Sequence, residues 1–175
     1  MAGAVVSSNA TAPAPPGGGA SPEELAMTEQ HSASVTLRQR RDYQFDIEFA
    51  PGMAHVTSDE SAPLGAGAGP SPVMLLLAAV GSCMSSSLYF ALSKFKNDSG
   101  GIRTTARGTL GRNEAGRLRV VHIAVEIHLG APAATLQHLE RVLGQFEEFC
   151  TVGASVRAGI ATDVAVFDGA GTQLT

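Results

Sequence analysis

The sequence contains no tryptophan, and aromatic residues make up only 5% of its 175 positions. Charged residues are also scarce, at 16% against 44% for hydrophobic residues. That charged share is low for a monomer, so we expect some apolar surface to be covered in an oligomer. The formal net charge is −4, which gives no electrostatic basis for binding nucleic acid or an anionic membrane.

Cysteine is nearly absent as well, with Cys83 and Cys150 as the two examples. They form no CxxC pair, and no Cys/His cluster has the spacing of a zinc site. Two cysteines are too few for a disulfide-stabilised secreted scaffold. The sequence also lacks a GxGxxG turn, a Walker loop and an HExxH motif, so we predict no metal, flavin or nucleotide cofactor.

Basic residues are missing from the first part of the chain, where Arg38 is the first Lys or Arg. Without them this part has the features of neither a secretory signal nor a transit peptide. Residues 1–33 are rich in Ala, Pro, Gly and Ser and have no hydrophobic period, so they have little to bury. We therefore predict a disordered tail over 1–33 and one folded domain over 34–175.

The most apolar stretch runs over residues 70–96 and carries Cys83 near its middle. Ser71 can cap the first turn of a helix, and Pro72 fits the first helical position, where a missing N–H costs nothing. The Asn-Asp-Ser-Gly-Gly sequence at 97–101 ends it. Apolar residues occupy every face of its first half, which predicts a buried central helix. The uninterrupted apolar run is too short to span a bilayer.

Strands are predicted on both sides of this helix. Before it we expect strands at 34–37, 43–49 and 53–57, with a polar turn at 38–42; after it we expect strands at 102–111, 118–129 and 160–167. A second helix is predicted to begin at Pro132, with an apolar face formed by Leu136, Leu139, Leu143, Phe146 and Cys150, and a short helix follows at 151–158. The order βββ-α-ββ-α-β with antiparallel hairpins predicts an α+β fold.

The residues alone leave two interpretations of the cysteines open. Free cysteine is among the most buried residue types, so both can be small core hydrophobes. A catalytic role needs a thiolate, a cation or N–H donors that lower its pKa, and a second thiol within reach of a disulfide. The sequence supplies two thiols but shows no activating base beside either of them.

Two segments resemble the OsmC-like family, which contains the osmotically inducible protein C group and the organic hydroperoxide resistance proteins. The first is PSPVMLLLAAVGSC at 70–83, where a Pro, a Leu-Leu pair and an Ala precede the cysteine. The second is the Phe-Cys-x-Val sequence at 149–152, followed by Gly159-Ile160 and an alternating strand. Taken with the order of elements, the resemblance covers about residues 34–175.

The resemblance implies an OsmC-like fold, with antiparallel sheets, a long buried central helix and an intertwined homodimer. It also implies thiol-dependent reduction of organic hydroperoxides. Cys83 looks like the peroxidatic cysteine and Cys150 like the resolving cysteine, and an external dithiol reduces the disulfide between them. The implied protein is a cytoplasmic homodimer that needs no cofactor.

The peroxidases of the family also place an arginine and a glutamate at the thiol. The candidates for the arginine are Arg38, Arg40, Arg41 and Arg157, from which we select Arg40 and Arg41; the alternative for this basic group is a solvated hairpin turn. The glutamate stands at the helix start, ten positions before the first cysteine, where this chain has Val73. That difference favours a second hypothesis, a non-enzymatic OsmC-fold module that binds an apolar small molecule at the dimer interface.

Histidines do not add a catalytic base to this picture. The chain has five, and none has a spacing that pairs it with a cysteine. We therefore interpret all of them as structural or exposed: His31, His55, His122, His128 and His138. The serines around Cys83 are interpreted as hydrogen-bonded within the helix.

Overall fold

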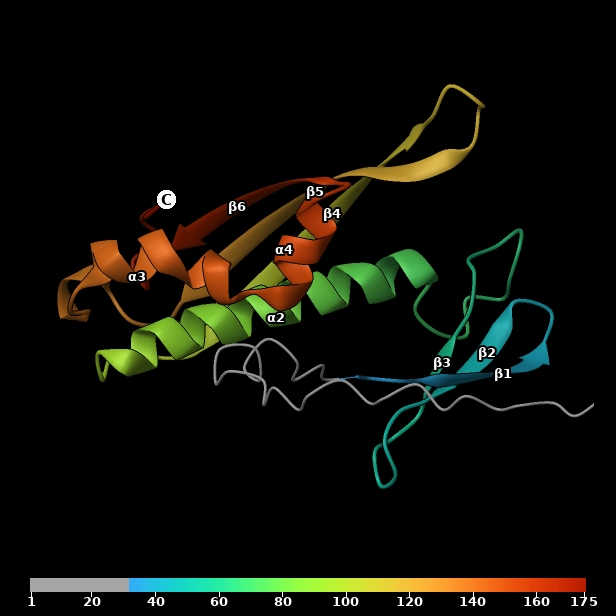
Figure 1. The fold of residues 1–175 in the computed structure, drawn as a ribbon, viewed down its shortest axis with the longest axis horizontal. Helices are drawn as coiled ribbons and strands as arrows, with labels where there is room; N and C mark the ends of the chain where they lie inside the picture. Colours follow the sequence, from blue (N-terminus) through green and yellow to red (C-terminus); the bar gives the residue numbers. More distant parts are fainter. Residues whose placement is uncertain (1–31) are drawn as a thin grey trace, which may run out of the picture. The chain divides into compact units, whose positions relative to one another are not determined.

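The computed structural model describes residues 32–175 (Figure 1), so the tail predicted over 1–33 lies almost wholly outside the described residues. The elements are β1 (Thr36–Arg41), β2 (Gln44–Glu48), β3 (Val56–Ser58), α2 (Pro72–Lys94), β4 (Ile102–Arg112), β5 (Leu118–Leu129), η1 (Ala133–Thr135), α3 (Leu139–Gln145), η2 (Phe146–Phe149), α4 (Thr151–Arg157) and β6 (Ala161–Phe167). This order confirms the predicted α+β class, with two three-stranded sheets.

The first sheet has the order β1-β2-β3 and is antiparallel throughout. The predicted polar turn at 38–42 is wrong for most of its length, because β1 continues to Arg41 and the chain reverses at Asp42 and Tyr43. Asp42 has a φ of 43°, a left-handed conformation that aspartate tolerates in tight turns. All of β1 is exposed, so its arginines stay in solvent without interrupting the strand.

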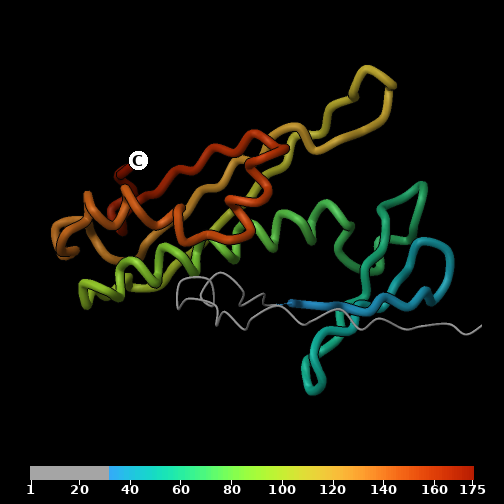
Figure 2. The backbone as a smooth tube through the Cα atoms, in the orientation of Figure 1, coloured from blue at the N-terminus to red at the C-terminus, as the bar shows by residue number. Residues whose placement is uncertain are grey.

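The second sheet has the order β4-β5-β6. The strand predicted at 118–129 is confirmed as β5, and of the alternating apolar residues that indicate it, Ile123, Val125, Ile127 and Leu129 are buried. Val121, which continues the same alternation, is 46% exposed. Strands β4 and β5 form the expected antiparallel hairpin, but β6 pairs with β5 in parallel, so the prediction of purely antiparallel sheets is wrong here. A parallel pair needs a crossover, and the segment from η1 to α4 supplies it (Figure 2).

Helix α2 begins as its sequence predicts. Ser71 is the N-cap, and its Oγ accepts a hydrogen bond from the Met74 N–H at 3.3 Å, while Pro72 occupies the first turn. The helix packs lengthwise along β4 and against the segment from α3 to α4 (Figure 1). Gly81 faces β4, where a Cβ would lie in ordinary van der Waals contact, 3.6 Å from the side chains of Thr104 and Ala106.

The described residues cover α2 on one side only, which corrects the prediction of a fully buried helix. Val80, Met84, Leu88 and Leu92 are 0% exposed and form the centre of the core. On the opposite side Met74, Tyr89 and Phe90 are 56%, 59% and 49% exposed. By length and composition alone α2 is apolar enough to cross a membrane. Its packing against the sheet is instead that of a core helix in a globular domain.

The predicted second helix is divided into separate pieces. His138, with a φ of 54°, stands between η1 and α3, and a 3-10 turn, η2, separates α3 from α4. The predicted apolar face is nevertheless correct, because Leu136, Phe146 and Cys150 are buried. The predicted short helix at 151–158 is confirmed as α4. Side-chain burial thus follows the 3-4 spacing although the backbone does not continue as one helix.

Asp168 joins the chain after β6 to the start of the crossover. It is 6% exposed, and its two carboxylate oxygens accept hydrogen bonds from the N–H groups of Ala133, Ala170 and Thr172 at 2.8 to 3.0 Å. The bond from Ala133 is the strongest cause of a pKa below the usual range for this carboxyl, followed by the bond from Thr172. The ionised form of Asp168 therefore stabilises the fold.

We expect Asp168→Asn to lower the unfolding temperature at neutral pH, because an amide has one acceptor oxygen for these N–H groups. The folded-state pKa is depressed, so the stabilisation exists above the pKa of the unfolded chain and is lost as the pH falls through the folded-state pKa. The unfolding temperature of Asp168→Asn should therefore fall less between pH 7 and pH 3 than that of the wild type. Asp42→Asn, in the exposed β1–β2 turn, is the control, and equal acid dependence in all three proteins would contradict the prediction.

Candidate active site

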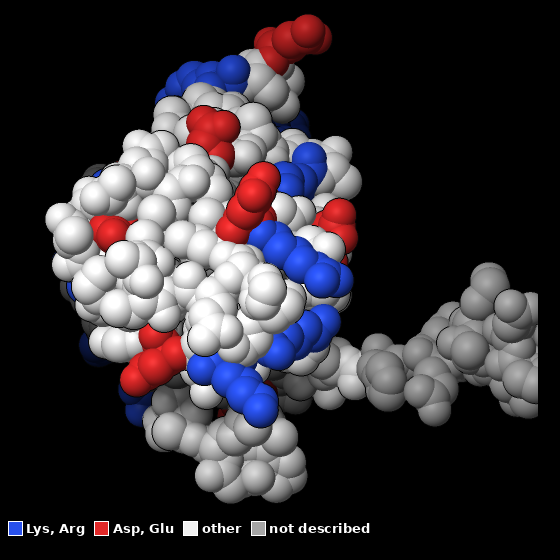
Figure 3. All heavy atoms as spheres, turned by 90° about the vertical axis from the view of Figure 1, so that its left-hand side faces the viewer, with Lys and Arg blue, Asp and Glu red and all other residues white. Residues whose placement is uncertain are grey.

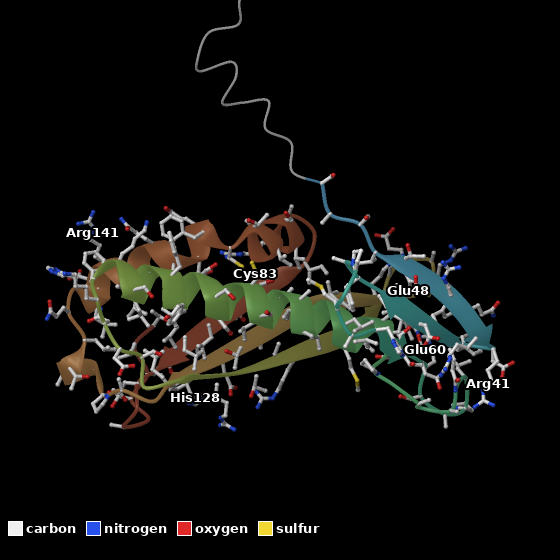
Figure 4. All side chains as sticks on the ribbon, turned by 90° about the horizontal axis from the view of Figure 1, so that it is seen from below. Arg41, Glu48, Glu60, Cys83, His128 and Arg141 are labelled. Atoms are coloured by element: carbon white, nitrogen blue, oxygen red, sulfur yellow. The ribbon has the colours of Figure 1, made fainter. Side chains whose placement is uncertain are left out.

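Two thiols meet where α2 passes the junction of η2 and α4. Cys83 lies near the middle of α2, half-buried, on the side that faces this junction (Figure 4). Cys150 is 0% exposed and is the N-cap of α4. The side chains of Cys83 and Cys150 are hydrogen-bonded to each other, and both are free thiols. The structure therefore brings together the two cysteines that the sequence offers as a reacting pair.

A glycine makes this close approach possible. The Gly153 N–H donates to the Cys150 Sγ at 3.2 Å. A Cβ at Gly153 would lie 2.7 Å from that sulfur and 3.0 Å from the Cε of Met84. Met84 is a core residue next to Cys83 in α2, so a larger residue at 153 would displace the Cys150 sulfur or the end of the Met84 side chain.

Backbone and hydroxyl groups shift the two thiol pKa values in opposite directions. Partial burial opposes ionisation of Cys83 and by itself would raise its pKa. Four hydrogen-bond donors act in the other direction: the Cys150 thiol, the N–H groups of Val152 and Gly153, and the Ser87 hydroxyl. Together they outweigh burial, so the pKa of Cys83 lies below its ordinary value. Burial raises the pKa of Cys150, as does its position as donor to the Cys83 sulfur. Cys83 is therefore the thiol of the pair that loses its proton more readily.

These hydrogen bonds separate the chemical roles of the two sulfurs. Cys83 is the more exposed thiol and the one that ionises first, which are the properties of a nucleophile. Cys150 is enclosed, its pKa is raised by burial, and its thiol contacts the Cys83 sulfur. This arrangement can carry out oxidation at Cys83 followed by disulfide formation with Cys150.

An apolar cavity of about 370 Å³ opens beside Cys83 and is lined by Cys83, Ser86, Ser87, Phe90 and Phe149. The rings of Phe90 and Phe149 meet edge to face with their centroids 5.4 Å apart. The Lys94 ammonium lies over both rings. Sequence reasoning missed Phe90 and Lys94 as site residues, although their helical spacing from Cys83 was a usable signal.

Arg40 and Arg41, the arginines selected from the sequence, take part in contacts within the first sheet. Arg40 forms an ion pair with Asp46 at 2.9 Å. The Nε of Arg41, which is labelled in Figure 4, donates to Gln44 Oε1 at 3.2 Å. The other candidates are also paired, Arg38 with Glu48 at 2.9 Å and Arg157 with Glu147 at 2.7 Å. No arginine is among the principal groups that shift the pKa of Cys83. A role for Arg40 or Arg41 at the thiol stays a prediction.

The described histidines lie elsewhere. His122 contacts Asp163 at 2.8 Å on the outer side of β5 and β6, and the ring of His128 stacks on Phe167. His138 packs against Phe95. Within residues 32–175, no group of three or more His, Cys, Asp or Glu side chains could hold a metal ion. As predicted for a serine near Cys83, the Ser85 Oγ donates to the Gly81 carbonyl within the helix.

Ser87 is the side chain whose removal should change Cys83 most selectively. It is 5% exposed, one turn from Cys83, and its hydrogen bond lowers the pKa of that thiol. We expect Ser87→Ala to raise the pKa of Cys83, so that alkylation of Cys83 by iodoacetamide requires a higher pH. The control is Ser82→Ala, an exposed neighbour of Cys83 that does not line its cavity, and this change should leave the pH profile unchanged. Alkylation of Cys83 is followed by peptide mass analysis at each pH. If wild type and Ser87→Ala give the same pH profile, Ser87 does not affect the thiol.

Comparison with known proteins gives a consistent result. A family model described as OsmC-like protein matches residues 65–165. The chain has no significant match among curated proteins. An OsmC-like protein from Vibrio cholerae has the same fold, with a TM-score of 0.64 at 21% identity over 77% of this chain and 99% of that one.

Two organic hydroperoxide resistance proteins are similar in structure. The one from Elizabethkingia anophelis superposes with a TM-score of 0.64 at 18% identity, over 80% of this chain and 98% of that one. OhrB of Bacillus subtilis superposes with a TM-score of 0.58 at 17% identity, over 78% of this chain and 98% of that one. At these identities the likeness is one of fold.

Proposed function

The chain belongs to the OsmC-like protein family, and from this premise we propose that it is a thiol-dependent peroxidase that reduces organic hydroperoxides. The observation that carries the proposal is the pair of thiols. Cys83, whose pKa is lowered, opens onto an apolar cavity, and Cys150, whose pKa is raised, lies behind it in hydrogen-bond contact. The organic hydroperoxide resistance proteins among the similar structures agree with this chemistry.

In the first step the Cys83 thiolate attacks the terminal oxygen of the hydroperoxide ROOH. The O–O bond breaks, a sulfenic acid forms on Cys83, and the alkoxide RO⁻ leaves and takes up a proton to become the alcohol. The N–H groups of Val152 and Gly153 and the Ser87 hydroxyl hold the thiolate before attack. The apolar walls formed by Phe90 and Phe149 suit an organic group R.

In the second step the Cys150 sulfur attacks the sulfur of the sulfenic acid. Water leaves, and a Cys83–Cys150 disulfide forms. An external dithiol then reduces this disulfide by thiol exchange and is itself oxidised to a disulfide. The complete cycle converts ROOH and the dithiol into ROH, water and the oxidised dithiol, without a bound cofactor. A cytoplasmic location suits it, because that compartment keeps dithiols reduced.

We further propose that the protein works as a homodimer. Large apolar side chains are exposed on β1, on β2's flanks and on one side of α2, and they include Leu37, Tyr43, Phe49, Met74, Tyr89 and Phe90. Extended apolar surface of this kind is typical of a protein–protein interface. A second copy of the chain is the occupant that fits the scarcity of charged residues.

A binding module without enzymatic activity is the second candidate, and one observation favours it. The first turn of α2 contains no acidic residue, and Val73 stands where the family's peroxidases have a glutamate. Such a module would hold an apolar small molecule in the cavity beside Cys83. Backbone N–H donors can nevertheless favour a thiolate without a carboxylate–arginine pair, which is why we rank the peroxidase first.

Peroxidase activity is tested by supplying purified protein with cumene hydroperoxide and a dithiol. We expect wild type to consume peroxide at least 100-fold faster than Cys83→Ser, since the serine hydroxyl is not ionised at neutral pH and is a weak nucleophile. The peroxide remaining is measured over time. If both proteins consume peroxide equally, the peroxidase proposal is wrong, and native mass spectrometry for a co-purifying apolar ligand then tests the binding module.

The role of Cys150 is tested by mass analysis after one equivalent of hydroperoxide. Wild type should lose two hydrogens in a peptide pair that joins Cys83 to Cys150. In Cys150→Ser the sulfenic acid on Cys83 should persist and react with a diketone probe specific for that group. If the sulfenic acid persists as long in wild type as in Cys150→Ser, and no peptide joining Cys83 to Cys150 is found, Cys150 is not the resolving cysteine.

A further inference from the structure

Helix α4 is attached to the rest of the molecule by few side chains. It has seven residues, a length at which an isolated helix is unstable in water. Its one buried residue is Gly153, which has no side chain, and Val152 and Val156 are partly buried against the core. The other residues of the helix are exposed. Because little apolar surface holds it, α4 has low local stability and its position depends on other contacts.

The two thiols supply those contacts at the first turn of α4. The Gly153 N–H donates to the Cys150 Sγ at 3.2 Å, so the sulfur of Cys150 caps the helix. The N–H groups of Val152 and Gly153 are also hydrogen-bonded to the Cys83 sulfur. A Cβ at Gly153 would lie 2.7 Å from the Cys150 sulfur. The first turn of α4 therefore lies directly on this sulfur and covers it.

The contacts that flank α4 act mainly on its neighbour η2. Phe146 is 1% exposed within the core, and the ring of Phe149 packs edge to face on that of Phe90. At the other end of α4, Arg157 forms an ion pair with Glu147 at 2.7 Å. The aromatic side chains hold η2 in place, which leaves this ion pair as the polar side-chain contact of α4.

An ion pair at the surface is a weak attachment. Figure 3 looks onto the end of the molecule that holds α3 and the C-terminal end of α2, and Lys and Arg side chains lie there among Asp and Glu side chains. Such exposed charges are screened by solvent and salt, so their pairs contribute little to stability. The Glu147–Arg157 pair, with both side chains 35% exposed, belongs to this class and does not hold α4 without the thiols.

We infer that α4 is a redox-sensitive cover, which the two thiols fix in the reduced protein and which unwinds once a disulfide joins Cys83 to Cys150. The inference rests on the disulfide of the proposed cycle and adds a regulation of that site. Neither sulfur can ionise in the disulfide, so the N–H groups of Val152 and Gly153 lose the thiolate as an acceptor. Cys150 stays tied to α2 by the covalent bond, while Gly153 leaves its sulfur. The disulfide is then open to the external dithiol.

Reduction restores the cover. One thiolate of the dithiol attacks a sulfur of the open disulfide, the S–S bond breaks, and the other protein sulfur leaves as a thiolate. The second thiol of the dithiol then displaces the first protein sulfur, so the dithiol becomes a disulfide and its two protons end on the two cysteines. The N–H groups at the start of α4 regain their acceptor and the helix forms again.

The test is amide hydrogen exchange of the full chain, measured by mass spectrometry, with the disulfide formed by diamide. Diamide takes one hydrogen from each thiol, so the disulfide forms without peroxide. We expect the N–H groups of residues 152–157 to exchange about tenfold or more faster in the oxidised protein, with α2 and β5 unchanged. Equal exchange in the two forms, or no disulfide after diamide, overturns the inference. Faster exchange in a protein that consumes no peroxide keeps the cover and discards the peroxidase.

Three variants separate the effect of the thiols from a general loss of stability. Cys150→Ser keeps a capping oxygen and forms no disulfide, so it should exchange alike with and without diamide. Gly153→Ala places a Cβ against the Cys150 sulfur, so residues 152–157 should exchange fast already in the reduced protein, while protection of α2 shows that the fold is intact. Gly159→Ala is the matched control, because nothing lies within 4 Å of a Cβ there. If reduced Gly153→Ala protects α4 as wild type does, the inference is wrong.

The need for unwinding is tested by the rate at which dithiothreitol reduces the disulfide formed by diamide. Ser155 is exposed in α4, and alanine is a better helix former than serine. Ser155→Ala should therefore disfavour unwinding and slow the reduction about twofold. Gly159→Ala, which lies outside the helix, should be reduced at the rate of wild type. Equal rates for Ser155→Ala and wild type would show that the dithiol reaches the disulfide without unwinding of α4, which contradicts the role of a cover.

Discussion

The structure depends on the burial of one face of α2. Val80, Met84, Leu88 and Leu92 pack into a core with the inward side chains of β5 and with Phe146 from η2. This packing fixes the rotation of α2 about its axis. Because Met84 must point into the core, Cys83 stands at the edge of the packed face, where α2 meets η2 and α4. The same rotation aligns Ser87, Phe90 and Lys94 along that edge. The site is thus a consequence of core packing and needs no strained backbone at the thiol.

Elements with a strong local signal could be predicted from the sequence. Helix α2 has a cap at Ser71, and β5 buries the four alternating residues Ile123, Val125, Ile127 and Leu129, so local sequence decides the start of α2 and the inward face of β5. The helix ends at Lys94, before the predicted stop at 97–101. The parallel pairing of β6 could not be predicted, because alternation does not say which neighbour a strand will have. The break at His138 was equally hidden, since the 3-4 apolar spacing continues through it while tertiary packing of Leu136 and Val142 decides the backbone.

For the site, the two cysteines could be predicted from the sequence, but the groups that surround Cys83 could not. The meeting of Cys83 with Cys150 was expected through family resemblance rather than from spacing, and the structure places the two in contact. The donors around Cys83 were missed because two of them are backbone N–H groups, which no residue type announces. Phe149 was overlooked as a cavity wall because its partner, Phe90, is distant in sequence. Arg40 and Arg41 were selected as side chains of the right charge, and in the described residues each has a partner within its own sheet.

The groups that lower the pKa of Cys83 explain how the proposed peroxidase can differ from its family at Val73. A carboxylate–arginine pair stabilises a thiolate with charges that must be oriented, whereas the N–H groups of Val152 and Gly153 are oriented by the backbone of α4 itself. The segment that supplies these donors also begins with Cys150. In the proposed cycle, the lowered pKa of Cys83 and the placement of Cys150 therefore have a single structural cause, the approach of α4 to α2 at Gly153. A change that moves α4 away removes both at once, while a change at Val73 leaves both in place.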